Sequence, residues 1–110
     1  MSKLTTLLAS AAFTLAALGS GARAETVKIG LVVKALGIGF FDAANKGAQE
    51  AAKELGDVEV IYTGPTKTTA EGQIEVIDAL IAQKVNAIAV SANDKDALVP
   101  VLKKAQERGI

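Results

Sequence analysis

The sequence of 110 residues carries 12 basic and 12 acidic side chains and contains no histidine and no cysteine. A chain without net charge lacks the basic surface that binds nucleic acids or anionic membranes. Without His and Cys, the sequence excludes Ser-His-Asp and Cys-His catalysis, His- or Cys-ligated metal sites, disulfides and a lipid-bearing cysteine.

The first 24 residues have the pattern of a removable export signal. Lys3 is the only charged residue before an apolar run over residues 4–18, and Ala22-Arg23-Ala24 has the small-x-small pattern that signal peptidase cuts. A membrane anchor is the alternative, but this run is shorter than the roughly 20 residues that a bilayer crossing needs. We therefore predict a signal peptide at residues 1–24 and a periplasmic protein that begins at Glu25 and is not inserted in the membrane.

The first predicted strand covers residues 27–33 and is almost continuously apolar, as is typical of a parallel strand with both faces covered. The helix that follows has small apolar residues at spacings of three and four, and Gly56 can end it. This small-residue stripe consists of Ala44, Ala48, Ala51, Ala52 and Leu55. We expect it to let the helix lie close on the sheet.

The second predicted strand covers residues 58–62 and carries Glu59 between apolar residues, which favours the edge of a sheet over its centre. A second helix is expected to begin with the capping box Thr68-x-x-Glu71. Its predicted buried stripe consists of Ile74, Ile77 and Ile81.

The third predicted strand, residues 87–90, is wholly apolar and is expected to be central, like the first. A third helix is predicted from about Asp96 to Arg108, with Gly109 at its end. Pro100 fits if it lies near the first turn of that helix. The inward-facing residues are predicted to be Leu98, Val101, Leu102 and Ala105.

The strands begin about thirty residues apart, which is the length of one βα unit. Right-handed crossovers then predict an α/β fold with a doubly wound, Rossmann-like parallel sheet in the flavodoxin-like order, with strand two outside strand one and strand three on its other side. The loops that begin at Lys34 and Ser91 should face each other where the winding reverses. Because Ile110 comes where a fourth strand is expected, we expect residues 25–110 to be the N-terminal part of a larger domain.

The segment from Lys34 to Phe41 places a cation and two adjacent aromatic rings at this predicted ligand-binding edge. An aromatic plate with hydrogen-bonding groups is complementary to a sugar, which has apolar C–H faces and a rim of hydroxyls. Gly37 and Gly39 would let the loop take backbone angles closed to other residues and approach a ligand closely. Two alternatives stay open: Lys34 as a solvated strand end, and at least one of Phe40 and Phe41 as a core residue.

Asn93 follows the third strand and is a further candidate ligand contact, although Asn93-Asp94 is also typical of a turn or the start of a helix, which is the interpretation we favour. The glycines match neither the dinucleotide fingerprint nor a Walker motif. We therefore predict no cofactor, no metal site and no catalytic residues.

From Val27 onward the chain resembles the N-terminal lobe of the periplasmic sugar-binding proteins of the ribose-type family, the solute receptors of ABC transporters. The resemblance is carried by the first loop and helix, in Gly39-Phe40-Phe41, Gly47-Ala48-Gln49-Glu50-Ala51-Ala52 and Lys53-Glu54-Leu55-Gly56. It implies a partial lobe of a type I periplasmic binding protein.

Lys34, Gly37, Gly39 and the Phe pair, followed by Tyr62-Thr63-Gly64-Pro65-Thr66, are similar to the rhamnose-binding and autoinducer-2-binding branch of that family. Relatives that bind ribose carry Asn-Pro before the Phe pair, where this chain has Ile38-Gly39. The resemblance therefore implies a monosaccharide ligand, with rhamnose favoured and autoinducer-2 as the alternative.

The resemblance also implies roles for residues and partners. Lys34 would hydrogen-bond ligand oxygens, and Phe40 and Phe41 would lie against the sugar ring. In the family an Asp in the loop after the fourth strand anchors ligand hydroxyls, and that loop would lie beyond Ile110. The expected protein is a monomeric receptor, not an enzyme, which closes two lobes around its ligand and presents it to a membrane permease.

Two other classes of function remain. The effector domain of a sugar-responsive repressor has the same fold, but it would need a helix-turn-helix where this chain has an export signal. A flavodoxin-like or other α/β enzyme is disfavoured because the chain has neither His nor Cys.

Overall fold

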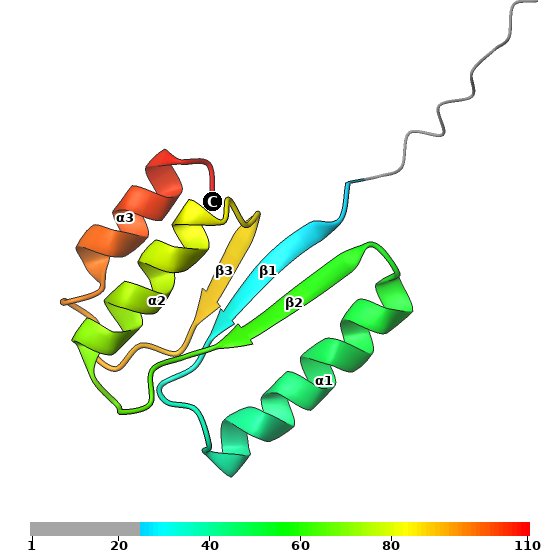
Figure 1. Cartoon of the computed structure of the whole chain (residues 1–110), viewed down its shortest axis with the longest axis horizontal. Helices are drawn as coiled ribbons and strands as arrows, with labels where there is room; N and C mark the ends of the chain where they lie inside the picture. Colours follow the sequence, from blue (N-terminus) through cyan, green and yellow to red (C-terminus); the bar gives the residue numbers. More distant parts are fainter. Residues whose placement is uncertain (1–24) are drawn as a thin grey trace, which may run out of the picture.

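The computed structural model describes residues 25–110, so the predicted signal peptide lies outside the described residues. Strands and helices alternate along this part of the chain (Figure 1). The elements are β1 (Val27–Val32), α1 (Gly39–Leu55), β2 (Val58–Thr63), α2 (Ala70–Ala82), β3 (Ala87–Val90) and α3 (Val99–Glu107). The predicted α/β class is confirmed.

The three strands form one parallel sheet in the order β2-β1-β3. Val27 pairs with Val58 on one side of β1, and Ile29 pairs with Ala87 on the other. The predicted doubly wound order is confirmed, with the winding reversal between β1 and β3. Within residues 25–110, β3 forms an edge of the sheet, although its apolar sequence is typical of a central strand.

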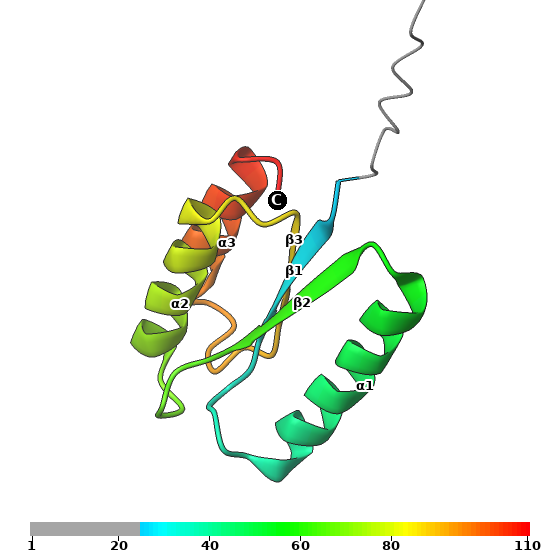
Figure 2. The ribbon, with the colours of Figure 1, turned by 45° about the vertical axis from the view of Figure 1, so that its right-hand side comes forward.

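The main core lies between the sheet and the pair α2–α3, which together cover one face while α1 lies on the other (Figure 2). Gly30 lets α2 approach the sheet closely, since a Cβ at this position would lie 2.5 Å from Cδ1 of Leu80. The buried cluster consists of Val32, Ile77, Leu80, Ile81, Val85, Leu98, Val101 and Ala105. Ile77 and Ile81 of the predicted stripe are buried, and Ile74 packs half-buried against the cluster.

Helix α1 covers its face of the sheet much less completely, because it packs mainly against the edge strand β2. Ala52 is its buried residue, whereas Leu55 is 66% exposed. A shallow apolar hollow of about 230 Å³ lies between the helix and the sheet, with Ile29 and Leu31 in its floor. The prediction of a closely packed stripe is therefore wrong for Leu55, Ala44 and Ala51, which stay exposed.

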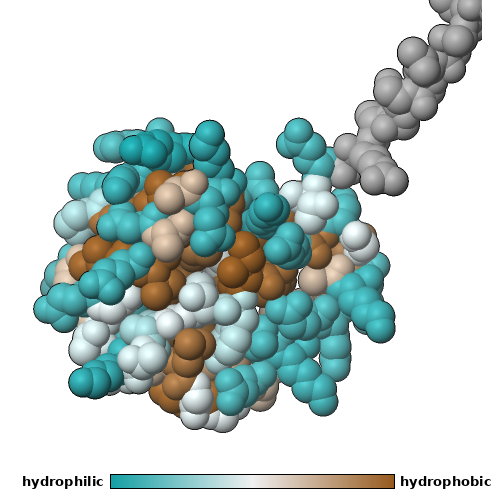
Figure 3. Space-filling model, viewed as in Figure 1, coloured by the Kyte–Doolittle hydropathy of each residue, from teal (hydrophilic) through white to brown (hydrophobic). Residues whose placement is uncertain are grey.

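The surface reflects this asymmetry. On the face seen in Figure 3, hydrophobic residues gather in the middle of the molecule and over its α2–α3 half, whereas the α1 side is mostly hydrophilic.

The end of α1 is as predicted: Gly56 has a φ of 80° and donates its N–H to the carbonyl of Ala52.

Helix α2 begins one residue later than the predicted capping box requires. Thr69, not Thr68, is the N-cap, and its Oγ1 accepts a hydrogen bond of 3.2 Å from the N–H of Gly72. Gly72 lies against Pro65, so closely that a Cβ on Gly72 would be 2.6 Å from Cβ of Pro65. With Thr69 as the N-cap, Gly72 is the third helical residue and Glu71 the second, so Glu71 does not occupy the capping-box position.

Helix α3 begins at Val99, not at Asp96, because the preceding residues form a turn around Asp94. Oδ1 of Asp94 accepts hydrogen bonds from the N–H groups of Ala97 at 2.8 Å and Asp96 at 2.9 Å. These donors hold the pKa of the Asp94 carboxyl below its ordinary value, so the turn is stabilised at neutral pH and loses this contribution as the pH falls through that lowered pKa. Pro100 lies in the first turn of α3, as expected.

Candidate ligand-binding site

The loops after β1 and β3 meet at the carboxyl edge of the sheet, as predicted. The side-chain amide of Asn93 donates from Nδ2 to the carbonyl of Lys34 at 2.9 Å and to the carbonyl of Thr69 at 3.2 Å. Asn93 therefore joins the two loops to the start of α2. The side chain therefore has a structural role between loops, while the turn that follows is held by Asp94. A ligand contact by Asn93 stays a prediction.

Gln73 lies directly beneath this junction and was missed by the sequence analysis. Its side chain is 0% exposed. Nε2 donates to the carbonyls of Val33 at 3.0 Å and Ser91 at 2.8 Å, and Oε1 accepts the N–H of Asn93 at 2.7 Å. A signal was available: Gln73 lies one turn before Ile77, so it is a polar residue in a stripe that is otherwise buried and apolar.

Lys34 is exposed at the end of β1. Its main-chain carbonyl is held by Asn93, so the backbone from which the side chain projects is fixed. In the described part of the chain the one ion pair joins Lys104 to Asp78 at 2.9 Å. The ammonium group of Lys34 is therefore not neutralised by a carboxylate of these residues.

Phe40 and Phe41 lie in the first turn of α1 with their rings nearly perpendicular, at a centroid distance of 5.2 Å and an interplanar angle of 87°. Phe40 is 77% exposed and Phe41 is half-buried. The expectation that at least one of them would be a core residue is wrong, because neither belongs to the buried core and Phe41 is only half-buried.

A hollow of about 270 Å³ lies beside both rings at the carboxyl ends of β1 and β3. Its lining is almost entirely apolar and consists of Leu31, Val32, Val33, Phe40, Phe41, Ala44, Ala89, Val90 and Ser91. The structure thus brings Phe40 and Phe41 together with the carboxyl ends of β1 and β3.

The first turn of α1 is tied to β2 by a hydrogen bond from the hydroxyl of Tyr62 to Oδ1 of Asp42 at 3.0 Å. Desolvation, followed by this bond and the charge of Asp42, raises the pKa of Tyr62 above its ordinary value of 10.0. Tyr62 therefore stays protonated and able to donate at neutral pH. The bond holds the helix start, and with it the Phe pair, beside the sheet.

The two glycines of the first loop have different roles. Gly37 has a φ of 82°, in the left-handed region that favours glycine, so the predicted use of its conformational freedom is confirmed. Gly39 begins α1 and has no positive φ, so that expectation is wrong for Gly39. The loop is also held to the loop after β2, because the N–H of Leu36 donates to the carbonyl of Pro65 at 2.9 Å.

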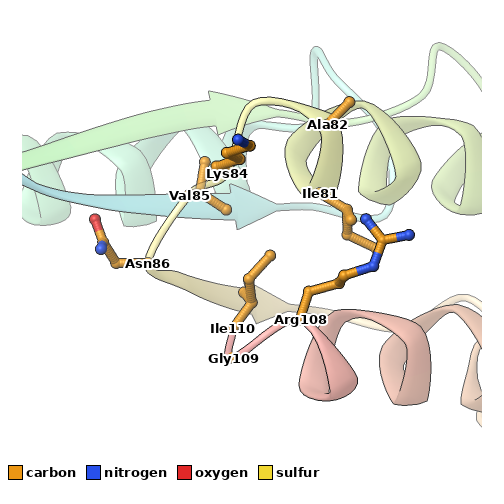
Figure 4. Close-up of a pocket in the computed structure, with 8 residues that line it drawn as sticks. All are labelled: Ile81, Ala82, Lys84, Val85, Asn86, Arg108, Gly109 and Ile110. Atoms are coloured by element: carbon orange, nitrogen blue, oxygen red, sulfur yellow. The ribbon is translucent and has the colours of Figure 1, made fainter.

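A larger hollow of about 350 Å³ lies at the opposite edge of the sheet, between the ends of α2 and α3 (Figure 4). In Figure 4 the guanidinium group of Arg108 lies beside Ile81, and Lys84 and Asn86 come from the loop before β3. Open α/β sheets bind ligands at the carboxyl ends of their strands, and this hollow adjoins the amino end of β3. The carboxyl edge therefore remains the candidate site.

Between residues 25 and 110 there is no group of three or more His, Cys, Asp or Glu side chains placed to hold a metal ion. None of the helices in this same region is long and apolar enough to cross a bilayer.

Comparison with known proteins identifies the family to which this chain belongs. The family described as periplasmic binding protein domain matches residues 29–110. The chain belongs to this family. The predicted partial lobe of a type I periplasmic binding protein is thereby confirmed, as is the resemblance to sugar-binding proteins of ABC transporters.

Three relatives show how far the similarity extends. The D-ribose/D-allose-binding protein of Pseudomonas aeruginosa is 36% identical over 88 residues, which are 78% of this chain and 28% of that protein. LsrB from Clostridium saccharobutylicum in complex with AI-2 superposes with a TM-score of 0.74 at 34% identity, covering 76% of this chain and 26% of that one. A solute binding protein from Clostridium phytofermentas with bound L-rhamnose gives a TM-score of 0.72 at 34% identity, covering 77% of this chain and 26% of that one.

The chain thus spans about a quarter of the length of these relatives. All three are binding proteins, which favours the prediction of a receptor over that of an enzyme.

Proposed function

We propose that this chain is part of a periplasmic receptor that binds a monosaccharide and presents it to the membrane permease of an ABC transporter. The observation that carries the proposal is the carboxyl edge of the sheet in a chain of the periplasmic binding protein family. At this edge the Phe pair lines an apolar hollow at the ends of β1 and β3, and Asn93 from the loop after β3 holds the main chain of Lys34. The complete protein would be a monomer of two lobes that close around the sugar.

The chemistry of the edge suits a sugar. The exposed ring of Phe40 and the apolar hollow beside it offer a surface for the C–H face of a pyranose or furanose ring. The ammonium of Lys34 can donate to hydroxyl oxygens. Nδ2 of Asn93 donates to two main-chain carbonyls, so its Oδ1 is the atom that can accept a hydrogen bond from a ligand hydroxyl. Lys34, Phe40, Phe41 and Asn93 are the proposed ligand contacts.

We propose L-rhamnose as the favoured ligand, because Lys34, Gly37 and the Phe pair together are similar to the rhamnose- and autoinducer-2-binding branch. AI-2 is the second candidate, supported by the similarity to LsrB. The ligands in the relatives' names differ, since they include ribose or allose, AI-2 and L-rhamnose. Ligand identity therefore needs a direct comparison.

Calorimetric titration of the complete protein with L-rhamnose, AI-2, D-ribose and D-allose tests the proposal. We expect L-rhamnose to bind with micromolar affinity and D-ribose to bind about fivefold more weakly for each hydrogen bond that it fails to make, because one hydrogen bond is worth about 1 kcal/mol. Saturable binding of AI-2 without binding of L-rhamnose would select the second candidate. No heat from any of the four would contradict the proposed function.

The proposed location predicts a processed N-terminus. Protein isolated from its native host should begin at Glu25 and should be released by osmotic shock, because Ala22-Arg23-Ala24 ends an export signal without a lipid-acceptor cysteine. Intact-mass and N-terminal peptide measurements check this. A mass that retains Met1 would show that the signal is not removed.

A further inference from the structure

We propose that Gln73 is a positioning residue that holds the two ligand-facing loops in their binding geometry. The proposal deepens the proposed function and rests on it, because it states how the site of that function is kept in place. Gln73 does not itself face a ligand, since its side chain is 0% exposed. It would act through Asn93 and the main chain of Val33 and Ser91.

The position of Gln73 at the end of the strand ladder gives it this role. The pairing of β1 with β3 ends at Val32 and Val90, and the last hydrogen bond between these segments runs from the N–H of Ser91 to the carbonyl of Val32 at 2.9 Å. Beyond this point the carbonyls of Val33 and Ser91 accept none of the backbone hydrogen bonds between segments within residues 25–110. Nε2 of Gln73 donates to both of them, so the side chain bridges the strands where the ladder stops.

The same side chain extends the bridge to the candidate ligand contacts. Oε1 of Gln73 accepts the N–H of Asn93 at 2.7 Å, and Nδ2 of Asn93 in turn donates to the carbonyl of Lys34. Two consecutive amide side chains therefore connect the buried interior of α2 to the backbone of Lys34. If Gln73 is replaced by an apolar residue, the buried carbonyl of Val33 loses a donor and the N–H of Asn93 loses its acceptor.

The three bonds require a primary amide at this distance from the helix. Two donors must point at carbonyls from different strands while one oxygen accepts an N–H, and among the side chains only Gln and Asn provide this set. Asn is one carbon shorter. A loop held in its bound conformation before the ligand arrives binds more tightly, because less ordering has to occur on binding.

The test compares Gln73→Met in the complete protein with two controls. Methionine has nearly the same length and volume as glutamine but has no N–H donors. Gln106→Met makes the same chemical change on the exposed surface of α3. Ile77→Val lowers the stability of the core one turn further along α2, where the side chain is 0% exposed and apolar, without touching the loops.

Two readouts are measured: the affinity for L-rhamnose by calorimetry, and the exchange rate of the Asn93 amide proton by NMR. Gln73→Met should weaken L-rhamnose binding about fivefold and speed the Asn93 exchange by a similar factor, as expected for losing about one net hydrogen bond. Both controls should stay within about twofold of the wild type. This pattern is the result expected of a positioning residue, because Ile77→Val lowers stability without loosening the loops.

Gln73→Met with affinity and Asn93 exchange both within twofold of wild type would overturn the proposal. Equal losses of affinity in Gln73→Met and Ile77→Val would overturn it too, since the effect would then follow stability. If Gln73→Met does not fold, Gln73→Asn takes its place with the same expectations, because its amide is too short to reach all three partners. If the wild type binds no L-rhamnose, the proposed ligand fails, and the Asn93 exchange rates still decide the role of Gln73.

Discussion

Residues 25–110 expressed alone should bind L-rhamnose roughly five thousand times more weakly than the complete protein, or not measurably. The proposed site is assembled from two lobes, and this chain spans about a quarter of the length of its relatives. The opposing lobe and the loop after a fourth strand would supply about five further hydrogen bonds at about 1 kcal/mol each. Their loss, about 5 kcal/mol, moves a micromolar dissociation constant into the millimolar range.

The described residues also predict how the isolated segment behaves. One face of its sheet has only α1 over β2, with an apolar hollow of about 230 Å³ beside that helix, and β3 presents an unpaired apolar edge. Open edges of this kind pair with other chains, and small domains with little buried surface are only marginally stable. We therefore expect residues 25–110 to associate in solution.

Calorimetry with L-rhamnose, together with sedimentation of the same sample, measures both expectations. The complete protein, titrated under the same conditions, is the control. A monomeric segment with micromolar affinity would contradict the two-lobe mechanism, because a single partial lobe would then suffice for binding.

Lys34→Ala in the complete protein should weaken L-rhamnose binding by roughly 1.5–3 kcal/mol, which is the usual contribution of a hydrogen bond from a charged group. The fold should remain stable, since the Lys34 side chain is exposed and its structural contact is made by the main-chain carbonyl. Calorimetry measures the affinity, and urea unfolding measures the stability.

Lys103→Ala is the matched control for this substitution, because it removes the same charge from the exposed surface of α3. Its affinity for L-rhamnose should equal that of the wild type. If Lys34→Ala binds as tightly as Lys103→Ala, Lys34 is a solvated strand end and makes no ligand contact.

The order of the elements and the meeting of the loops after β1 and β3 could be predicted from the sequence alone. Apolar runs mark each strand, and the spacing of about thirty residues between them leaves room for one crossover helix. The handedness of such crossovers then places β1 between β2 and β3. The meeting of the loops at Lys34 and Ser91 follows from that order. These features are local patterns or general rules of chain geometry, which a sequence contains directly.

Only the tertiary structure decided which of several suitable residues takes each role. Thr68 and Thr69 are both good N-caps, and in the folded chain it is the hydroxyl of Thr69 that accepts the N–H of Gly72. The small-residue stripe of α1 is equally suited to the centre or the edge of the sheet, and its packing on β2 leaves Leu55 exposed. Gln73 is buried because carbonyls from two distant strands converge on it. Each choice depends on contacts between segments far apart in the chain, which no local pattern specifies.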